Sequence, residues 1–273
     1  MFSKNGIIYR SDIISDPRVA HGFSGRAGGV STITHLASLN LTDGLGDQPE
    51  NVAQNTDIFA RAVSEGLLGG ESTVRTNQIH SAQVRFIDSS NAGEGYSLPW
   101  GEDADGFVTD VPGVMPVIRT ADCVPILLCG VRVDSSPIIG AVHAGWRGTV
   151  LGIAGEAVEK MAAAGCVRES IRVAVGTHIK SCCYEVDDPF YEAVSSHQSR
   201  DFAARHIKPA DMPGKYSADL AAMNIEILCG VGVLREMIDV SPYCSACDPD
   251  TFFSHRAGHG KRGTMGAGIV ILP

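Results

Sequence analysis

The sequence predicts one domain that mixes strands and helices, and three observations support this. Short apolar runs rich in β-branched residues, such as 138–142, are typical of buried strands. Between such runs lie segments with apolar residues at helical spacing, such as 150–161. No repeat, linker or low-complexity tract divides the 273 residues. A single domain over residues 1–273 is therefore the simplest organisation.

The first half of the chain predicts mostly strands. One helix is expected at 50–66, where apolar residues recur on one face directly after Pro49. The most apolar stretch is interrupted by Thr-Ala-Asp-Cys at 120–123, and such local conflicts are expected at functional sites. The expected strands cover residues 7–9, 19–23, 74–87 (with a polar interruption at 77–80) and 114–129, and a turn is expected at Pro112-Gly113, after the segment 104–109.

The second half predicts strands and helices in alternation. After the helix at 150–161, which Thr149 could cap and Gly165 could end, a second amphipathic helix is expected at 219–229. Residues 187–216 are polar and mixed, which favours a helix and a mobile loop around Pro209 and Pro213. The expected strands cover residues 138–142, 171–175, 230–243 and 265–272.

Composition excludes some classes of partner. The formal net charge is −9 and no block of Lys or Arg occurs, which argues against a nucleic-acid backbone or an anionic membrane surface. The start has no apolar signal core and no run approaches a membrane span, so a cytoplasmic location is expected. Eight cysteines in such a chain are then expected to be thiols or metal ligands rather than a disulfide framework.

Two Gly-rich turns carry arginines. The turn after the strand at 138–142 delivers His143 and Arg147 and precedes a helix, so it could offer backbone N–H groups to an anion. Arg26, among the glycines of 24–31, could present a guanidinium to an anion in the same way. Each turn could equally be structural, with a packed histidine in the first and a solvated arginine in the second.

Three residues suggest a metal site. His80, Cys123 and His143 each lie at a polar interruption beside an apolar β-like segment, so they could converge at strand ends. Two histidines and one cysteine with an open fourth position are the ligand set of a catalytic zinc site.

The other cysteines give a weaker signal. Cys244 and Cys247 form a CxxC pair with Cys229 upstream, and they are a rival metal site. Without a second pair at zinc-finger spacing, reduced thiols on a turn are favoured there. Cys182 and Cys183 cannot easily bridge each other as neighbours, and nothing in the sequence marks them as ligands.

Nine short motifs, in order, resemble those of the YfiH-like family, which was long labelled "laccase domain" or multicopper polyphenol oxidoreductase. The resemblance covers about residues 19–271, and the blocks at 120–123 and 143–148 are the most specific. The motifs are His-Gly-Phe-Ser at 21–24, Arg-x-Gly-Gly-Val-Ser at 26–31, Ser-Leu-Asn-Leu at 38–41, Gln-Ile-His at 78–80, Ala-Asp-Gly at 104–106, Thr-Ala-Asp-Cys at 120–123, His-Ala-Gly-Trp-Arg-Gly at 143–148, Cys-Tyr-Glu-Val at 183–186 and Phe-Phe-Ser-His-Arg at 252–256.

The resemblance implies an α+β fold in one compact domain. Mixed β-sheets are expected to pack together with helices outside, similar to the catalytic domain of cytotoxic necrotising factor. Two local departures from the family pattern, Gly-Thr at 176–177 and the segment 261–265, put the shape of those loops and the base preference in question.

The resemblance also implies a zinc-dependent purine nucleoside phosphorylase acting on adenosine, inosine or methylthioadenosine, with adenosine deaminase side activity. His80, Cys123 and His143 match the metal ligands, and Cu²⁺ could replace Zn²⁺ there. The partners would be small nucleosides and phosphate, and the protein would be a monomer or homodimer. The residues expected to bind substrate or phosphate are Arg26, Asn40, Arg147 and Arg256.

Chemistry adds catalytic candidates and alternatives. Arg147 suits transition-state stabilisation, while Asp122 and Glu185 are carboxylates that could transfer protons or simply fix loops. A copper polyphenol oxidase is disfavoured because no HxH pair occurs. A metal-free hydrolase, with Cys123 as nucleophile and His143 as base, could act on cell-wall precursors. A non-catalytic interaction protein fits least.

Overall fold

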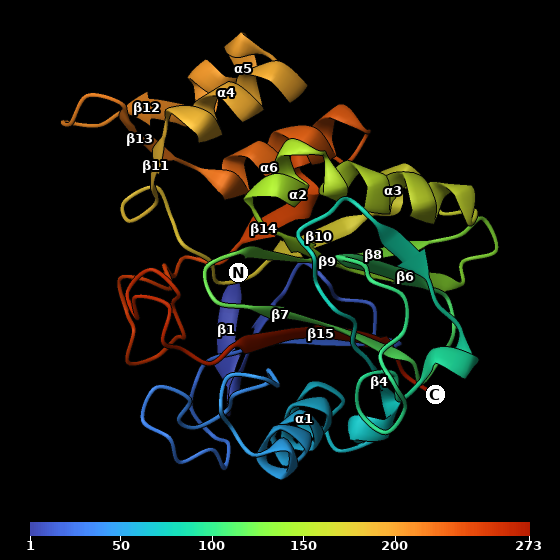
Figure 1. Ribbon diagram of the computed structural model, residues 1–273. Coiled ribbons are helices and arrows are strands. Elements are labelled where there is room, and N and C mark those ends of the chain that lie inside the picture. Colours follow the sequence, from blue (N-terminus) through green and yellow to red (C-terminus); the bar gives the residue numbers. More distant parts are fainter.

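Two six-stranded sheets packed face to face form the centre of the computed structural model, which describes residues 1–273 (Figure 1). The first sheet consists, in spatial order, of β1 (Phe2–Asn5), β2 (Ile8–Ser11), β3 (Val19–Ser24), β15 (Met265–Ile271), β7 (Met115–Thr120) and β4 (Thr73–Val74). The second sheet consists of β14 (Ile238–Val240), β10 (Arg172–Val175), β8 (Val124–Val131), β9 (Pro137–Ala144), β6 (Gly106–Thr109) and β5 (Val84–Phe86).

Both sheets are mixed. Most neighbouring strands run antiparallel, but β4 pairs with β7, β5 with β6 and β10 with β14 in parallel. A third, small sheet holds β11 (Glu185–Asp187), β13 (Lys215–Ala218) and β12 (Ile207–Pro209), all antiparallel.

Strand alternation explains why β8 is apolar throughout. Successive side chains point to opposite faces of a sheet. Ile126 and Leu128 accordingly join the core beneath the helices, whereas Leu127 and Cys129 join the core between the two sheets. A strand covered on both faces needs apolar residues at nearly every position.

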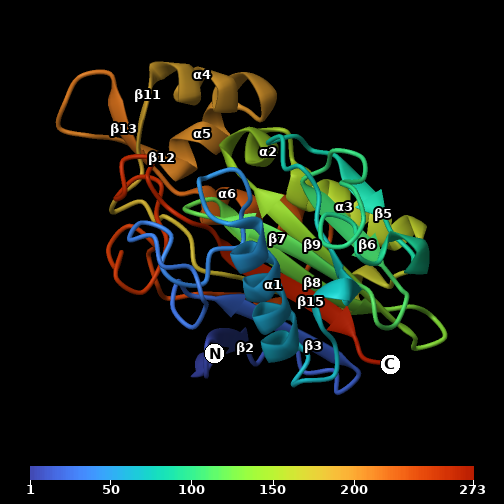
Figure 2. The ribbon, with the colours of Figure 1, turned by 60° about the horizontal axis from the view of Figure 1, so that its bottom comes forward.

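Helices cover the outer faces of both large sheets. The helix α1 (Pro49–Val63) lies on the first sheet, where Phe59 and Val63 pack against strand residues (Figure 2). The second sheet is covered by α2 (Trp146–Val150), α3 (Ile153–Ala163) and α6 (Leu220–Gly230). Beyond these lie α4 (Asp188–His197), α5 (Arg200–His206) and the small sheet (Figure 1). Single 3₁₀ turns occupy Gly70–Ser72, Ser89–Asn91, Arg168–Ser170 and Arg235–Met237.

The expected architecture of mixed sheets packed together with helices outside is confirmed in this compact α/β body. The similarity to the catalytic domain of cytotoxic necrotising factor stays a prediction. No helix has the length and apolar character needed to cross a bilayer.

Four local expectations differ from the structure. Residues 187–216 hold more than the expected helix and loop: they form α4, α5 and strand residues of the small sheet, and the loop is confined to the turn between β12 and β13. Thr149 is not a helix cap, since it lies inside α2 and its hydroxyl accepts a hydrogen bond from Asn224. The expected helix at 150–161 is broken, because Gly152 adopts a φ of 80° between α2 and α3. Only short strands occupy the two ends of 74–87.

Candidate functional site

His80, Cys123 and His143 come together from three segments of the chain. His143 lies near the end of β9, Cys123 directly precedes β8, and His80 lies in the loop between β4 and β5. The pairing of β8 with β9 places Pro125 opposite His143, which brings the start of one strand to the end of the other. The potential ligand atoms of the three residues all lie within 4.8 Å of one another.

Asp105 fixes two of these three residues. One carboxylate oxygen lies 2.8 Å from His143 Nδ1 and also accepts from the His80 backbone N–H at 3.0 Å. The other oxygen accepts from the N–H and the hydroxyl of Ser81 and from the N–H of Ile79. Burial raises the pKa of the Asp105 carboxyl, but these hydrogen bonds lower it by a larger amount. The pKa of Asp105 therefore lies below its ordinary value. With Nδ1 engaged by a carboxylate, His143 is left to use Nε2 as a ligand.

Strained backbone occurs beside the same centre. His80 has a φ of 61° and Asp122 a φ of 93°, a region that side chains other than glycine rarely adopt. Asp122 is held there by its carboxylate, which accepts from the Ser245 hydroxyl at 2.6 Å and from the Arg256 backbone N–H at 2.7 Å. Such strain persists only where the surroundings hold it, as they often do in active sites.

A metal ion fits these residues. His80 Nδ1 is buried and has no hydrogen-bond partner, which is unusual for an imidazole nitrogen. A Cβ added at Gly145 would lie 2.4 Å from that nitrogen and 3.3 Å from Cys123 Sγ, so the glycine leaves the space beside both atoms free. Two imidazoles and a thiolate suit zinc or copper.

Electrostatics around the three residues favour a cation. Burial lowers the pKa of His143, but the Cys123 sulfur and the Asp105 carboxylate raise it, to about 9 overall. Burial and the neighbouring His143 lower the pKa of His80. The negative groups that favour a proton on His143 would equally favour a metal cation in its place.

A cavity of about 980 Å³ opens onto this centre. That volume is at the upper end of the range for small-molecule sites. Besides the three metal-ligand candidates, its lining includes Gln78, Trp100, Arg119, Tyr184, Arg256 and Arg262.

Two of the lining arginines have free donors. The Nε atoms of Arg119 and Arg262 are buried without a hydrogen-bond partner. The Arg119 guanidinium donates one bond, to Thr76 O, and lies 4.9 Å from the ring centre of Trp100. Burial lowers the pKa of both groups; for Arg119 it falls to about 10, so that guanidinium remains cationic near neutral pH.

The structure places only part of the predicted substrate set at the cavity. Arg256 lines it, but its guanidinium donates to the backbone oxygens of Cys183 and Glu185. Arg26 does not line it: the Arg26 guanidinium donates to Ala37 O, Pro249 O and Thr34 O. The exposed Arg147 lies beside Trp146, outside the lining residues.

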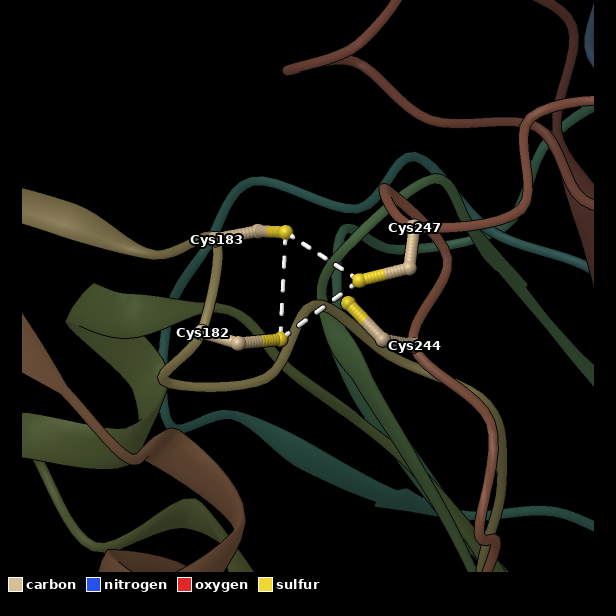
Figure 3. A group of neighbouring side chains, drawn as sticks. All are labelled: Cys182, Cys183, Cys244 and Cys247. Carbon is tan, nitrogen blue, oxygen red and sulfur yellow. Dashed lines mark hydrogen bonds between the residues drawn. The ribbon is translucent and has the colours of Figure 1, made fainter.

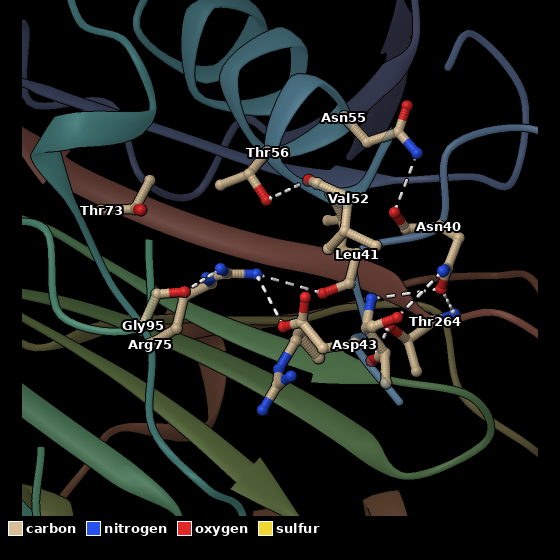
Figure 4. A network of polar contacts seen from close by, with 12 residues as sticks. Asn40, Leu41, Asp43, Val52, Asn55, Thr56, Thr73, Arg75, Gly95 and Thr264 are labelled. Atoms are coloured by element: carbon tan, nitrogen blue, oxygen red, sulfur yellow. Dashed lines mark hydrogen bonds and ion pairs between the residues drawn. The ribbon is translucent and has the colours of Figure 1, made fainter. Parts of the chain in front are cut away.

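Asn40 acts behind the cavity wall rather than in it. It is fully buried, and its Oδ1 accepts from the N–H groups of Thr42 and Thr264, both of which line the cavity (Figure 4). In the same network, Asp43 pairs with Arg75 at 3.8 Å. The structure therefore makes Asn40 a support for two wall residues.

The two predicted proton-transfer residues differ in position. Asp122 lines the cavity beside Cys123. Glu185 has an exposed side chain on β11 and does not line the cavity. Its carboxylate also accepts no hydrogen bond, so the structure gives Glu185 a contact for neither of its two predicted roles.

Arg119, Arg262 and Asp105 were not among the site residues predicted from the sequence. Arg119 is a charged residue within the apolar β7, and Asp105 directly precedes the buried β6, which are signals that could have been used. Arg262 belongs to the segment 261–265, where the family departure falls, so this departure does reach the cavity. The departure at 176–177 does not: Thr177 is buried, and its hydroxyl bonds that of Ser241.

Comparisons with known proteins agree over nearly the whole chain. The sequence model of a family described as multi-copper polyphenol oxidoreductase laccase matches residues 20–272. A relative from Geobacillus stearothermophilus, named purine nucleoside phosphorylase YlmD, is 34% identical over 84% of this chain and 82% of its own length. A relative from an unknown prokaryotic organism, named adenosine deaminase RL5, is 35% identical over 86% of this chain and 87% of its own.

Solved structures give the same result for the fold. The hypothetical protein YfiH from Bacillus licheniformis superposes with a TM-score of 0.88 at 28% identity. The superposition covers 99% of this chain and 98% of that one.

Proposed function

The chain belongs to the multi-copper polyphenol oxidoreductase laccase family, and from this premise we propose that it is a purine nucleoside phosphorylase. The family membership confirms the resemblance found in the sequence. The observation that carries the proposal is the location of the group formed by His80, Cys123 and His143. That group lies in the wall of a cavity that also presents unpaired guanidinium donors.

Phosphate would be bound by Arg262 and Arg119. The Arg262 guanidinium has no hydrogen-bond partner among the protein groups, and Arg119 keeps an unpaired Nε. Guanidinium groups grip phosphate oxygens with paired N–H donors, and buried donors without acceptors are costly. A bound phosphate would satisfy them and place an anionic nucleophile in the cavity.

The nucleoside would lie between aromatic side chains. Trp100, Trp146 and Tyr184 line the same cavity and offer apolar ring surfaces for a purine. The Arg119 guanidinium lies 4.9 Å from the centre of the Trp100 ring, a cation–π contact that helps to hold this ring in place. A purine leaving group also needs a proton, and Asp122 is the carboxylate we propose to supply or relay it.

His80, Cys123 and His143 would hold the metal, which we propose to be zinc because three imidazole and thiolate ligands with an open fourth position have the ligand number of a catalytic zinc site. When bound there, zinc supplies a Lewis acid at the cavity wall. Asp105 would orient His143 and the His80 loop for that purpose. The set contains too few histidines for a multi-copper oxidase centre, so we do not propose polyphenol oxidation.

A second activity, deamination of adenosine, is favoured by one feature. Asp122 lies directly beside Cys123 in the cavity wall, so a carboxylate stands next to a candidate metal ligand. Zinc deaminases use a carboxylate in such a position to move protons. The relative named adenosine deaminase RL5 supports including this activity in the test.

The test is chromatography of adenosine and inosine incubated with protein of known zinc content, with and without phosphate. We expect phosphate-dependent release of adenine or hypoxanthine, and its loss in His80→Ala and Cys123→Ala. The exposed His197 on α4 provides the control His197→Ala, which should retain activity. Inosine formed from adenosine without phosphate would establish the deaminase activity. A zinc-replete sample that turns over neither nucleoside would contradict the proposal.

A metal-free hydrolase using Cys123 and His143 is the remaining candidate. It is favoured by the closeness of the two side chains, whose Sγ and ring nitrogen atoms lie within 4.8 Å of one another. A bound zinc ion would occupy the thiolate that such an enzyme needs as nucleophile. The metal-free hydrolase would therefore be ruled out if the protein contains one zinc ion per site and loses its activity when that zinc is removed.

A further inference from the structure

Four cysteines from two loops gather at one point outside the site described above. Cys182 and Cys183 precede β11, and Cys244 and Cys247 follow β14 (Figure 3). Their four sulfur atoms all lie within 4.8 Å of one another. The sequence favours free thiols for the CxxC pair, which lacks a second pair at zinc-finger spacing, and it marks nothing at 182–183. The two pairs are more than sixty residues apart in the chain, and the fold brings them together. Cys229, expected as a possible third ligand, lies in α6 and is not part of the group.

The spacing of the sulfur atoms is that of a metal site. Cys182 Sγ lies 3.8 Å from Cys183 Sγ and 3.6 Å from Cys247 Sγ, and Cys183 Sγ lies 3.4 Å from Cys247 Sγ. Four thiolates at about 2.3 Å from a tetrahedral zinc ion are about 3.8 Å apart. A disulfide instead needs about 2.0 Å between two sulfur atoms.

The surroundings suit bound thiolates. The Lys180 backbone N–H donates to Cys244 Sγ at 3.4 Å, which is the kind of bond that stabilises a sulfur ligand. A zinc ion with four thiolates carries a net charge of −2. Two cationic side chains hydrogen-bonded to these loops would partly offset this charge. The Lys180 ammonium group donates a hydrogen bond to Pro242 O, and the Arg256 guanidinium donates one to Cys183 O.

We propose that Cys182, Cys183, Cys244 and Cys247 bind one zinc ion in a closed structural site, separate from the group of His80, Cys123 and His143. Four thiolates leave no open position for a substrate, so this ion would have no direct part in chemistry. Zinc is preferred over iron and copper here because a closed tetrahedral sulfur set without a redox role is its usual structural site.

The site would clamp the two loops that frame one side of the cavity. Tyr184 follows Cys183 directly, and Ser245 lies between the other two ligands and donates to Asp122. Arg256 joins the loops a second time through Cys183 O and Glu185 O. Apart from the bridge between 178 and 244, these loops lack extended backbone pairing with each other, so a metal would replace it.

The test is the zinc content of protein expressed with zinc and purified under reducing conditions. We expect two zinc ions per chain in the wild type. His80→Ala should retain one, and X-ray absorption of that sample should show four sulfur neighbours at about 2.3 Å. Cys182→Ser and Cys247→Ser should each retain one ion with mixed nitrogen and sulfur neighbours. Cys229→Ser, which alters a cysteine outside both groups, should keep two.

Several results would overturn the proposal. One such result is that the wild type binds a single zinc ion per chain and that His80→Ala loses it. Another is that the ion retained by His80→Ala has nitrogen neighbours. A third is fewer than eight free thiols in denatured, chelator-treated protein kept without reductant after purification, since this would indicate a disulfide in the group. The His80→Ala arm decides the matter even where a cysteine variant fails to fold. Metal content is read without substrate, so failure here is distinct from failure of the phosphorylase proposal.

Discussion

Asp105 joins His80 and His143 through one carboxylate, so its effect can be tested on metal binding itself. We expect Asp105→Asn to weaken zinc binding at this centre by about 10- to 100-fold, because the support of both ligands changes. Competition with a chromophoric chelator measures this. The exposed Glu102, whose side chain makes no hydrogen bond, provides the control Glu102→Gln. Unchanged affinity in a folded Asp105→Asn protein would show that the carboxylate does not support the ligands.

Arg262 tests the phosphate site. We expect Arg262→Ala to raise the KM for phosphate by about 10- to 100-fold, since a charged hydrogen-bonded contact contributes about 1.5–3 kcal/mol. The KM for the nucleoside should change less. The adjacent, exposed Lys261 supplies the control Lys261→Ala. Initial rates at varied phosphate measure both variants, and a phosphate KM equal to that of the wild type in Arg262→Ala would remove Arg262 from the proposed site.

Individual residues could be predicted where chemistry and sequence position coincide. His80, Cys123 and His143 each interrupt an apolar segment, so the sequence alone brought them together as candidates, and the structure places them in contact. Arg262 lies in a polar, Gly-rich loop where an arginine is unremarkable. Arg26 stood out among glycines, yet it binds carbonyl oxygens of neighbouring loops. The guanidinium of an arginine in a Gly-rich turn can donate to backbone carbonyl oxygens as well as to phosphate oxygens, and the sequence does not distinguish the two cases.

Between elements, the break from α2 to α3 depends on one glycine. Gly152 has a φ of 80° and nothing within 4 Å of a Cβ built on it, so Gly152→Ala changes only the backbone preference. A left-handed residue with a Cβ costs about 1–2 kcal/mol. We expect that loss in the free energy of unfolding, measured by urea denaturation.

Gly230 gives a matched control for this substitution. It is the last residue of α6, its φ lies outside the left-handed region, and a Cβ there also meets nothing within 4 Å. Gly230→Ala should leave stability unchanged or raise it by up to about 1 kcal/mol, because alanine favours the helix. Equal effects of the two substitutions would contradict the role assigned to the left-handed turn.

Elements were predictable where their own periodicity was strong. The strands at 138–142 and 265–272 and the helix at 219–229 are confirmed with small shifts in their ends. The segment 187–216 was not predictable, because β12 and β13 contain only three and four residues with little apolar alternation. These strands exist through their pairing with each other and β11, which local sequence does not report.

At the scale of the molecule, pairing between distant segments decides the architecture. The strand β15 near the end of the chain lies between β3 and β7, and β10 lies between β8 and β14. Apolar runs indicate buried strands but not which strand lies beside which. The cluster of four cysteines follows the same rule, since only the fold brings residues 182–183 close to residues 244–247.

The contact between the two large sheets makes stability depend on pH. His21 on β3 is 4% exposed, and its Nε2 accepts from the Ser11 N–H at 3.1 Å. Ser11 in turn donates its hydroxyl to Asp239 on β14, in the other sheet. Burial is the main cause that lowers the pKa of His21, to about 4.

The sign of the effect follows from this lowered pKa. In the unfolded chain His21 has a pKa near 6.5, so between about pH 6.5 and 4 the unfolded state binds the proton and the folded state does not. Its contribution to stability is therefore complete above pH 6.5 and is lost as the pH falls towards 4. The loss between pH 7 and pH 5 is about 2 kcal/mol.

His21→Gln separates this contribution from all others, because glutamine can accept the Ser11 bond but does not titrate. Urea denaturation in the presence of a chelator should show a decrease from pH 7 to pH 5 that is about 2 kcal/mol smaller in the variant than in the wild type. Protonation of the remaining histidines and carboxylates occurs in both proteins and cancels in the difference. Parallel pH dependence in the two proteins would mean that His21 takes up its proton without disturbing the contact between the sheets.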